Sequence, residues 1–211
     1  MLTVRLEASD RPALRAHFLA LGREDRRLRF GFHARDSTIE RYVKDIDFTR
    51  DAVFGVRRTQ GDESQFDGIT HVALEKNHAE IGVSVLEHAR SQGIGSALVS
   101  RAARHGCNHG IEVLYMQCLS ENCAIMRIAR TLGMKVVTLG SDSEARMALP
   151  AVKRVVTSSA KPAVIALETV AEQIALCDAA LCAELLPNVS KRPSVAPTLT
   201  ELLASRQRAA A

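Results

Sequence analysis

The chain has 211 residues, of which 46% are hydrophobic and 25% charged. This composition is typical of one folded domain with an appendage, or of two small domains. The formal net charge of +4 is too small to predict a nucleic-acid-binding protein, and an aromatic content of 4% without Trp argues against a stacking surface for single-stranded nucleic acid. We therefore expect no nucleic-acid partner.

No apolar run follows a basic segment at the N-terminus, and no stretch is long enough to cross a bilayer. The sequence thus predicts neither a secretory signal nor a membrane partner. An odd number of cysteines without the paired spacing of a zinc site indicates reduced thiols, so we expect a cytoplasmic protein with no metal. The cysteines are Cys107, Cys118, Cys123, Cys177 and Cys182.

The first half of the sequence predicts a strand at 2–6, two helices and then three strands. The first helix begins at Ser9 and Asp10 with Pro12 in its first turn, and the second begins at Ser37, where Glu40 completes a capping box. The arginine-rich stretch 23–29 is interpreted as a solvated helix end. Three apolar runs separated by polar turns, the first turn reaching from Thr59 to Gly68, predict an antiparallel meander at 52–56, 69–74 and 81–86.

The second half alternates helices and strands. A glycine-containing turn at 90–95 opens a helix, and an apolar strand follows at 111–117. Ser120 is the predicted cap of a helix that runs to Leu132 and ends at Gly133. Two strands, 135–139 and 144–149, complete a domain over residues 1–150. The order β-α-α-β-β-β-α-β-α-β-β indicates an α+β, or mixed α/β, fold around a single sheet.

Residues 151–211 form a predicted helical tail with a composition of its own. Pro162 and Pro187 bracket a helix at 163–186, a linker covers 187–197, and a short helix covers 198–208. The long helix carries apolar residues every three or four positions, a spacing that suits packing on its own domain or pairing with a second chain. The tail is therefore a candidate contact for a homodimer.

The turn at residues 90–97 is the most informative segment. Gly93 and Gly95 let the backbone approach a ligand closely, and the first N–H groups of the following helix point into the same space. This arrangement suits a pyrophosphate. A Rossmann unit is the alternative, but it needs a third glycine where Leu98 stands, and an acidic residue at the end of the next strand, whereas Glu112 lies at its start.

The segment 79–85, followed by Arg90-x-x-Gly93-x-Gly95, resembles the acetyl-CoA site of the GNAT N-acetyltransferase superfamily. Asn122 with the later Leu132-Gly133-Met134 is similar to a second motif of that family. The resemblance covers residues 1–149 and is strongest over 79–134. It implies a GNAT-like fold with a single, largely antiparallel central sheet flanked by helices. Arg29-Phe30 and Tyr42-Val43 resemble a bacterial subgroup that includes protein lysine acetyltransferases.

Site residues follow from this resemblance. It implies that the backbone of Val83, Ser84 and Val85 binds the pantetheine arm and the thioester carbonyl. It implies that Arg90 adds positive charge at the pyrophosphate, and that Asn122 contacts the pantetheine arm or orients the helix that does. The amides that hold the pyrophosphate would be those of Gln92, Gly93, Ile94, Gly95 and Ser96.

The reaction needs a neutral amine, and an alkyl amine with a pKa of about 10.4 is mostly protonated at neutral pH. Glu80 is the candidate general base because it begins the strand expected beside the thioester, and His71 and His78 are alternatives. Many relatives place a Tyr acid seven residues after the Asn, where this sequence has Ala129; Tyr115 is the nearby Tyr. A covalent route through Cys118 or Cys123 is a further alternative.

The sequence therefore predicts an N-acetyltransferase that uses acetyl-CoA as co-substrate and acts on a small-molecule amine or a protein lysine. An acyl-CoA-binding regulatory protein without catalysis is the alternative from another class. A GNAT-shaped interaction domain is a third, but an interaction scaffold has no need of the glycine turn at Gly93 and Gly95.

Overall fold

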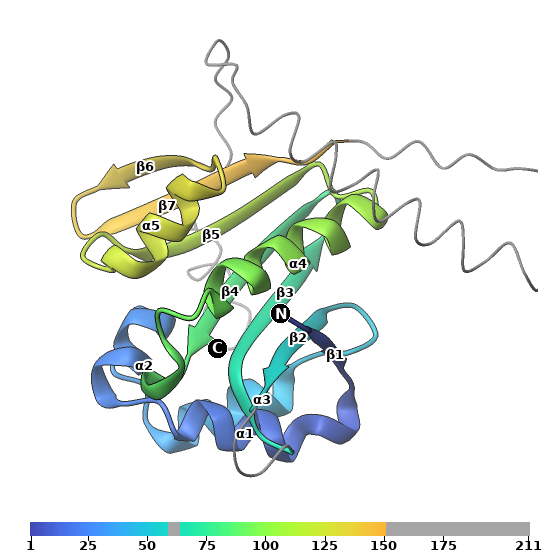
Figure 1. Ribbon diagram of the computed structural model, residues 1–211, viewed down its shortest axis with the longest axis vertical. Helices are drawn as coiled ribbons and strands as arrows, with labels where there is room; N and C mark the ends of the chain where they lie inside the picture. The colour runs from blue at the N-terminus through green and yellow to red at the C-terminus, as the bar shows by residue number, and fades with distance from the viewer. Residues whose placement is uncertain (59–63, 151–211) are drawn as a thin grey trace, which may run out of the picture.

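A computed structural model describes residues 1–58 and 64–150. The predicted tail, including its helices at 163–186 and 198–208, lies outside the described residues. Within them, one seven-stranded sheet has the order β1-β2-β3-β4-β5-β7-β6, and every neighbouring pair is antiparallel except β4 and β5 (Figure 1). The predicted fold class, a largely antiparallel central sheet flanked by helices, is confirmed.

The elements follow one another in the predicted order, with one additional helix. The strands are β1 (Val4–Leu6), β2 (Ala52–Arg57), β3 (Phe66–Glu75), β4 (His78–Val85), β5 (Val113–Leu119), β6 (Lys135–Leu139) and β7 (Asp142–Ala148). The helices are α1 (Arg11–Leu19), α2 (Arg23–Phe30), α3 (Asp36–Asp45), α4 (Ile94–Asn108) and α5 (Cys123–Thr131), with short 3-10 turns at Ala8–Asp10 and Glu87–Ala89.

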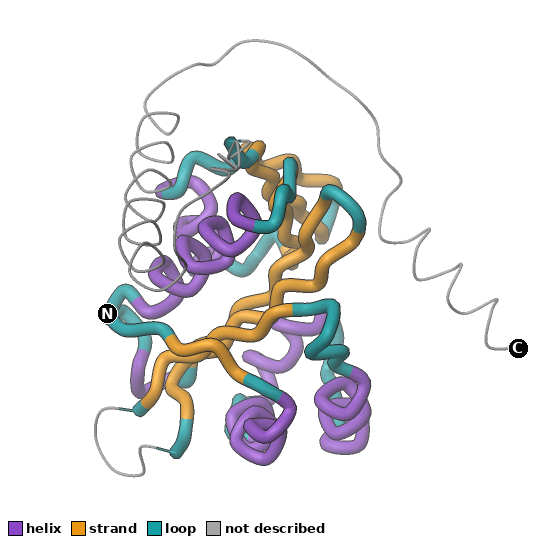
Figure 2. The backbone as a smooth tube through the Cα atoms, turned by 90° about the vertical axis from the view of Figure 1, so that its right-hand side faces the viewer, coloured by secondary structure: helices purple, strands orange, loops and turns teal. Residues whose placement is uncertain are grey.

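Helices cover both faces of the sheet, so the core has two halves (Figure 2). One half joins α1 and α3 to β2 and β3 through buried side chains such as Leu14, Phe18 and Ile39. The other joins α4 and α5 to the middle strands and includes Leu98 and Ile81. Alternation along β4 directs successive side chains to opposite halves. No helix of the described residues is long and apolar enough to cross a membrane.

The arginine-rich stretch is a separate helix, and its interpretation as a solvated helix end was wrong. Helix α2 follows Gly22 and ends at Gly31, which adopts the left-handed conformation with φ of 81°. Arg26 donates hydrogen bonds to the carbonyl oxygens of Leu19 and Leu21, at the end of and just after α1. The Arg26 guanidinium therefore joins α2 to the end of α1, and the charge pattern of the sequence does not distinguish this role from exposure to solvent.

Several predicted element ends also differ from the structure. Strand β3 begins at Phe66, so the turn predicted to reach Gly68 is shorter. Asn122, not Ser120, caps α5. Helix α3 begins at Asp36 after Arg35, and no side chain caps it, so the capping box predicted at Ser37 is absent there. Gly133 does follow the end of α5, with φ of 73°, as predicted.

The sheet opens between β4 and β5. Their parallel pairing ends at Glu80 and Tyr115, although β4 continues to Val85 and β5 to Leu119. Beyond this point β5 pairs with β7 alone among the described strands. The edge of β4 that faces β5 is thus left with backbone groups available to a ligand.

Candidate functional site

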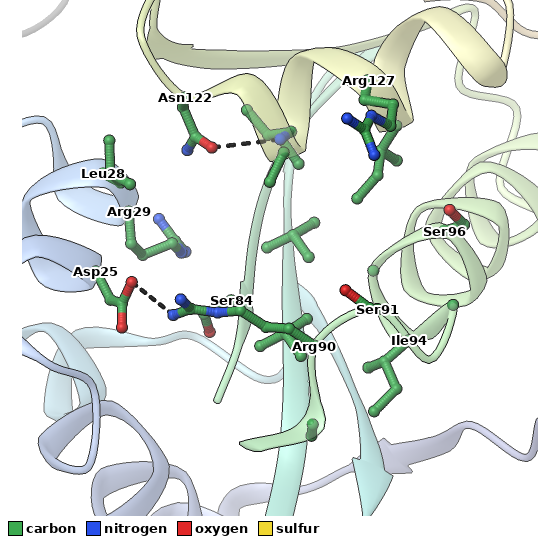
Figure 3. A pocket seen from close by; sticks show the side chains of 18 of the residues that line it. Asp25, Leu28, Arg29, Ser84, Arg90, Ser91, Ile94, Ser96, Asn122 and Arg127 are labelled. Atoms are coloured by element: carbon green, nitrogen blue, oxygen red, sulfur yellow. Dashed lines mark hydrogen bonds and ion pairs between the residues drawn. The ribbon is translucent and has the colours of Figure 1, made fainter. Parts of the chain in front are cut away.

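A cavity of about 390 Å³ lies where β4 and β5 diverge. Its walls come from the end of β4, the turn before α4, the first turns of α5, and α2 (Figure 3). Predicted cofactor residues that line it are Val83, Ser84, Val85, Arg90, Gly93, Ile94, Gly95, Ser96 and Asn122. The prediction had not included its other lining residues, which are Leu21, Asp25, Leu28, Arg29, Ala89, Ser91, Ala124, Ile125, Arg127 and Ile128.

The N-terminus of α4 forms one end of the cavity. Gly93 precedes the helix with φ of 80°, and Ser91 has φ of 62°, so the turn uses two left-handed residues to direct the chain into the helix. Gly95 lies under α5, where a Cβ would come 2.7 Å from Ile128 Cδ1. The free N–H groups of the first turn and the dipole of a 15-residue helix together favour an anion at this end.

Arg90 and Gln92 differ from the other predicted cofactor residues. The Arg90 guanidinium forms an ion pair with Asp25 of α2 at 2.6 Å, across the cavity (Figure 3). Gln92 does not line the cavity, and its side-chain amide donates to the carbonyl oxygen of His88 at 3.4 Å. Arg90 is thus placed to join two walls.

Asn122 has a structural role at this site. Its side-chain oxygen accepts a hydrogen bond from the backbone N–H of Ile125 at 3.3 Å and so caps α5. Ile125 and Ile128 of the same helix line the cavity. The cap therefore fixes the start of the helix that forms one wall, and a role of Asn122 toward a pantetheine arm stays a prediction.

A second, smaller cavity of about 20 Å³ continues between the two diverging strands. Gly82 and Val83 line it from β4, and Met116 and Gln117 line it from β5. Arg29 and Asn122 line both cavities. A long ligand with an anion at α4 could therefore extend its other end along β4 into the opening of the sheet.

Glu80 lies just beyond this narrow end and lines neither cavity. It is half-buried, and strand alternation places it on the same face of β4 as Gly82 and Ser84. Its register partner in β5 is Tyr115, which shares that face. Burial raises the pKa of Tyr115 to about 12, and Glu80 contributes to the increase, so the phenol keeps its proton at neutral pH. Ala129 is fully buried in the core.

The alternatives to Glu80 have other surroundings. His71 lies between two side chains: its Nδ1 is 2.8 Å from the Tyr42 hydroxyl, and its Nε2 is 3.2 Å from Asp51 Oδ2. His78 pairs with Glu75 at the turn between β3 and β4, at the far end of β4 from the large cavity. Burial raises the pKa of the Cys118 thiol, which disfavours the thiolate that a covalent route would need.

The Ser84 side chain is held under the sheet by a buried histidine. His17 of α1 lies 2.8 Å from Ser84 Oγ through Nε2 and 2.9 Å from the Phe66 carbonyl oxygen through Nδ1. Burial lowers the pKa of His17 to about 4 from an ordinary 6.5, so the ring is neutral at pH 7. Nδ1–H then donates to Phe66, and Nε2 accepts from Ser84.

This histidine predicts a loss of stability in acid. Between pH 6.5 and about 4 the unfolded chain protonates the ring of His17 and the folded chain does not, so stability falls as the pH falls through this window. The full difference corresponds to roughly 3 kcal/mol. Urea unfolding at pH 7 and pH 4 should show a larger loss for the wild type than for His17→Gln. Equal losses would contradict a neutral His17.

Among the described residues, no group of three His, Cys, Asp or Glu side chains is placed to hold a metal ion. Arginines supply three of the four charged side chains that line the large cavity: Arg29, Arg90 and Arg127, against Asp25. The site therefore offers backbone donors, positive charge and a long apolar wall, which suits an anionic ligand with an extended neutral arm.

Comparisons with known proteins agree with this geometry. Residues 2–135 match the family model described as an acetyltransferase (GNAT) domain. No protein of curated function matches the chain in sequence. The fold is similar to the GNAT domain of PAT from S. lividans, with a TM-score of 0.59 and 14% identity over 70% of this chain and 89% of that one.

Two further solved structures are similar in fold. A ribosomal-protein-alanine N-acetyltransferase from Brucella melitensis has a TM-score of 0.53 and 17% identity, over 71% of this chain and 100% of that one. RimL, a ribosomal alpha-N-protein acetyltransferase solved in complex with coenzyme A, has a TM-score of 0.53 and 15% identity, over 71% of this chain and 94% of that one.

Proposed function

Because the chain belongs to the GNAT acetyltransferase family, we propose that it transfers an acetyl group from acetyl-CoA to a primary amine. The observation that carries this proposal is the cavity between β4 and β5, whose one end is the N-terminus of α4 and whose other end narrows into the opening of the sheet. The family supports acyl transfer in general, and the shape of the cavity supports a ligand with an anion at α4 and an extended arm along β4.

In this proposal the pyrophosphate of acetyl-CoA binds the amides of Gln92 to Ser96. The pantetheine arm follows the backbone of Val83 to Val85, whose β5-facing edge has no strand partner among the described residues. The thioester then lies at the small cavity beside Gly82. Gln92 contributes only its backbone, and Arg90 keeps the wall formed by Asp25 in place.

The reaction is a direct attack. The amine nitrogen forms a bond to the thioester carbonyl carbon, and the C–S bond breaks as the tetrahedral intermediate collapses. Glu80 accepts the amine proton, directly or through a water molecule, and the CoA thiolate takes a proton from solvent or from Tyr115. Backbone N–H groups of β4 beside the carbonyl oxygen stabilise its developing charge.

Two kinds of acceptor fit this reaction, a small-molecule amine and a protein lysine. The solved structures of similar fold include enzymes named for ribosomal proteins, which is a property of those proteins. The cytoplasm is the expected compartment, and a homodimer through residues 163–186 stays a prediction.

One observation favours a second candidate function, an acyl-CoA-responsive binding protein. The position at which many relatives carry a Tyr acid is Ala129, which is fully buried and offers no proton. A chain that binds acetyl-CoA and does not transfer the acetyl group is consistent with this residue.

Labelled acetyl-CoA mixed with the purified protein and a lysate of its source cells tests the two candidates. We expect label on protein or on small molecules, and the labelled fraction identifies the class of acceptor. Tight acetyl-CoA binding without transfer to either fraction would contradict catalysis and favour the binding protein.

A further inference from the structure

The positive charge of Arg29 is only partly compensated by the residues around it. The side chain extends from α2 toward the large cavity (Figure 3) and lines both cavities. Two other arginines of α2 have carboxylate partners: Arg26 pairs with Asp36, and Arg27 pairs with Glu24 and Glu121. Among the described residues, no carboxylate forms an ion pair with Arg29.

The contacts of Arg29 compensate its charge only in part. The guanidinium carbon lies 5.1 to 5.9 Å from the ring centroids of Phe18, Phe30 and Tyr42. One nitrogen donates to the Tyr42 hydroxyl at 2.9 Å, while the buried Nε has no hydrogen-bond partner among the described residues. A guanidinium has five N–H donors, and a buried donor that lacks a hydrogen-bond partner lowers the stability of the folded protein.

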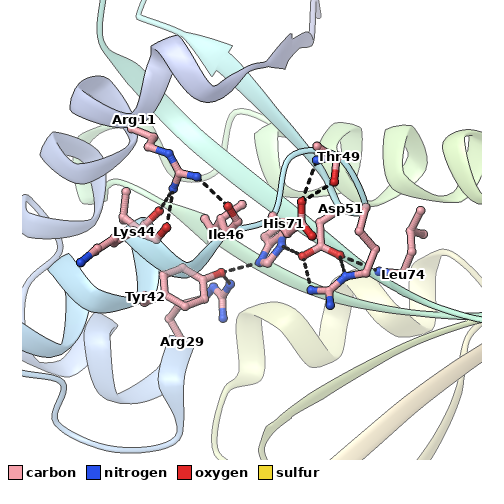
Figure 4. Close-up of polar contacts among 12 residues, drawn as sticks. Arg11, Arg29, Tyr42, Lys44, Ile46, Thr49, Asp51, His71 and Leu74 are labelled. Carbon is pink, nitrogen blue, oxygen red and sulfur yellow. Dashed lines mark hydrogen bonds and ion pairs between the residues drawn. The ribbon is translucent and has the colours of Figure 1, made fainter.

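A chain of hydrogen bonds fixes the orientation of this guanidinium (Figure 4). The Tyr42 hydroxyl accepts from Arg29 and donates to His71 Nδ1 at 2.8 Å, and His71 Nε2–H donates to Asp51 at 3.2 Å. Asp51 is in turn held by Arg50 and by the backbone N–H of Leu74. Burial alone would raise the pKa of Asp51, but these hydrogen bonds hold it below its ordinary value.

The guanidinium lies against β4 at Gly82. A Cβ built on Gly82 would overlap its terminal atoms, so only glycine leaves room for Arg29 at this place. Glu80 is two residues before Gly82 on the same face of the strand, so the Cα atoms of these two residues are about 7 Å apart. A cation and the candidate base therefore flank the narrow end of the site, where the acetyl group and the amine are to meet.

Resting on the proposed function, we propose that Arg29 binds a carboxylate carried by one of the two substrates beside the thioester. The carboxylate belongs either to the acceptor, as in an amino acid with its amine at Glu80, or to the acyl group of a dicarboxylic acyl-CoA. Either source gives the guanidinium a planar, bidentate partner, which Arg recognises better than Lys does.

Matched pairs of ligands test the proposal on the full chain. For the acyl group, calorimetry compares malonyl-CoA with acetoacetyl-CoA, which has a similar length and lacks the carboxylate. For the acceptor, transfer from acetyl-CoA compares each standard amino acid that is accepted with its carboxamide. The variants are Arg29→Gln and Arg29→Lys, and the control is Arg27→Gln, which removes a neighbouring arginine of α2.

In one of the two arms the wild type should prefer the carboxylate-bearing ligand, and Arg29→Gln should reduce that preference by roughly 10- to 100-fold. Arg29→Lys should retain part of it and Arg27→Gln all of it. The arm that responds identifies the source of the carboxylate. Circular dichroism and urea unfolding of Arg29→Gln show whether the domain is still folded.

Two results would overturn the proposal: no preference that depends on Arg29 in either arm, or a loss in Arg29→Gln that is equal for both members of every pair. The second result would mean that Arg29 contacts the thioester or supports the folded structure, and does not bind a carboxylate. A wild type that does not bind acetyl-CoA is a different failure, because it contradicts the proposed function itself.

Discussion

Replacement of Gly93 by aspartate should abolish acetyl-CoA binding while the domain stays folded. Gly93 has φ of 80°, a conformation that Asp and Asn adopt more readily than other residues, and no atom lies within 4 Å of a Cβ built there. The substitution would therefore place a negative charge at the N-terminus of α4 with little steric change. We expect the affinity to fall by at least about 100-fold, as the loss of several charge-assisted contacts would cause.

Gly93→Asn is the matched control, because it has the same shape and no charge. Calorimetry with acetyl-CoA should show a much smaller loss for Asn than for Asp, and circular dichroism should show the same fold for both. Wild-type affinity in Gly93→Asp would refute the placement of the pyrophosphate. Equal losses in the two variants would assign the effect to backbone strain and leave the anion site without support.

The parts of this site that the sequence predicted are those set by local chemistry. A glycine just before an apolar helical pattern favours a turn that enters the helix through a left-handed residue, so the start of α4 near Gly93 was predictable. Strand β6 occurs at the predicted residues, 135–139, because a capped helix and Gly133 precede it and a turn follows. In both places the pattern of a few neighbouring residues decides the structure.

The parts that it missed depend on residues far apart in the chain. Helix α2 carries six charged residues among eight, a pattern of a solvated surface, yet Arg29 lies over the aromatic rings of Phe18 and Tyr42. The opening between β4 and β5 is likewise a property of register, and the apolar pattern of either strand gives no sign that pairing stops at Glu80. The charged wall formed by Asp25 and Arg29 could therefore not be predicted.

Replacement of Glu80 by glutamine should lower kcat strongly at pH 7 and less at pH 9, with the acceptor that the labelling experiment identifies. A general base contributes roughly 10²- to 10⁴-fold. An alkyl amine with a pKa of about 10.4 has roughly 100-fold more of its neutral form at pH 9 than at pH 7, so the base is needed less there. Full pH profiles of kcat for the wild type and the variant measure this difference.

Glu75→Gln is the control for Glu80→Gln. Both carboxylates act on Tyr115 and raise its pKa, but Glu75 lies at the exposed end of β3, at the turn into β4. If Glu80 removes the amine proton, the Glu75 variant should keep the wild-type profile while the Glu80 variant loses activity most at low pH. An equal loss at pH 7 and pH 9 would mean that Glu80 positions the acceptor or the strand. Proton removal would then fall to solvent, and the half-buried carboxylate would serve to hold a cationic amine beside the thioester until it loses its proton.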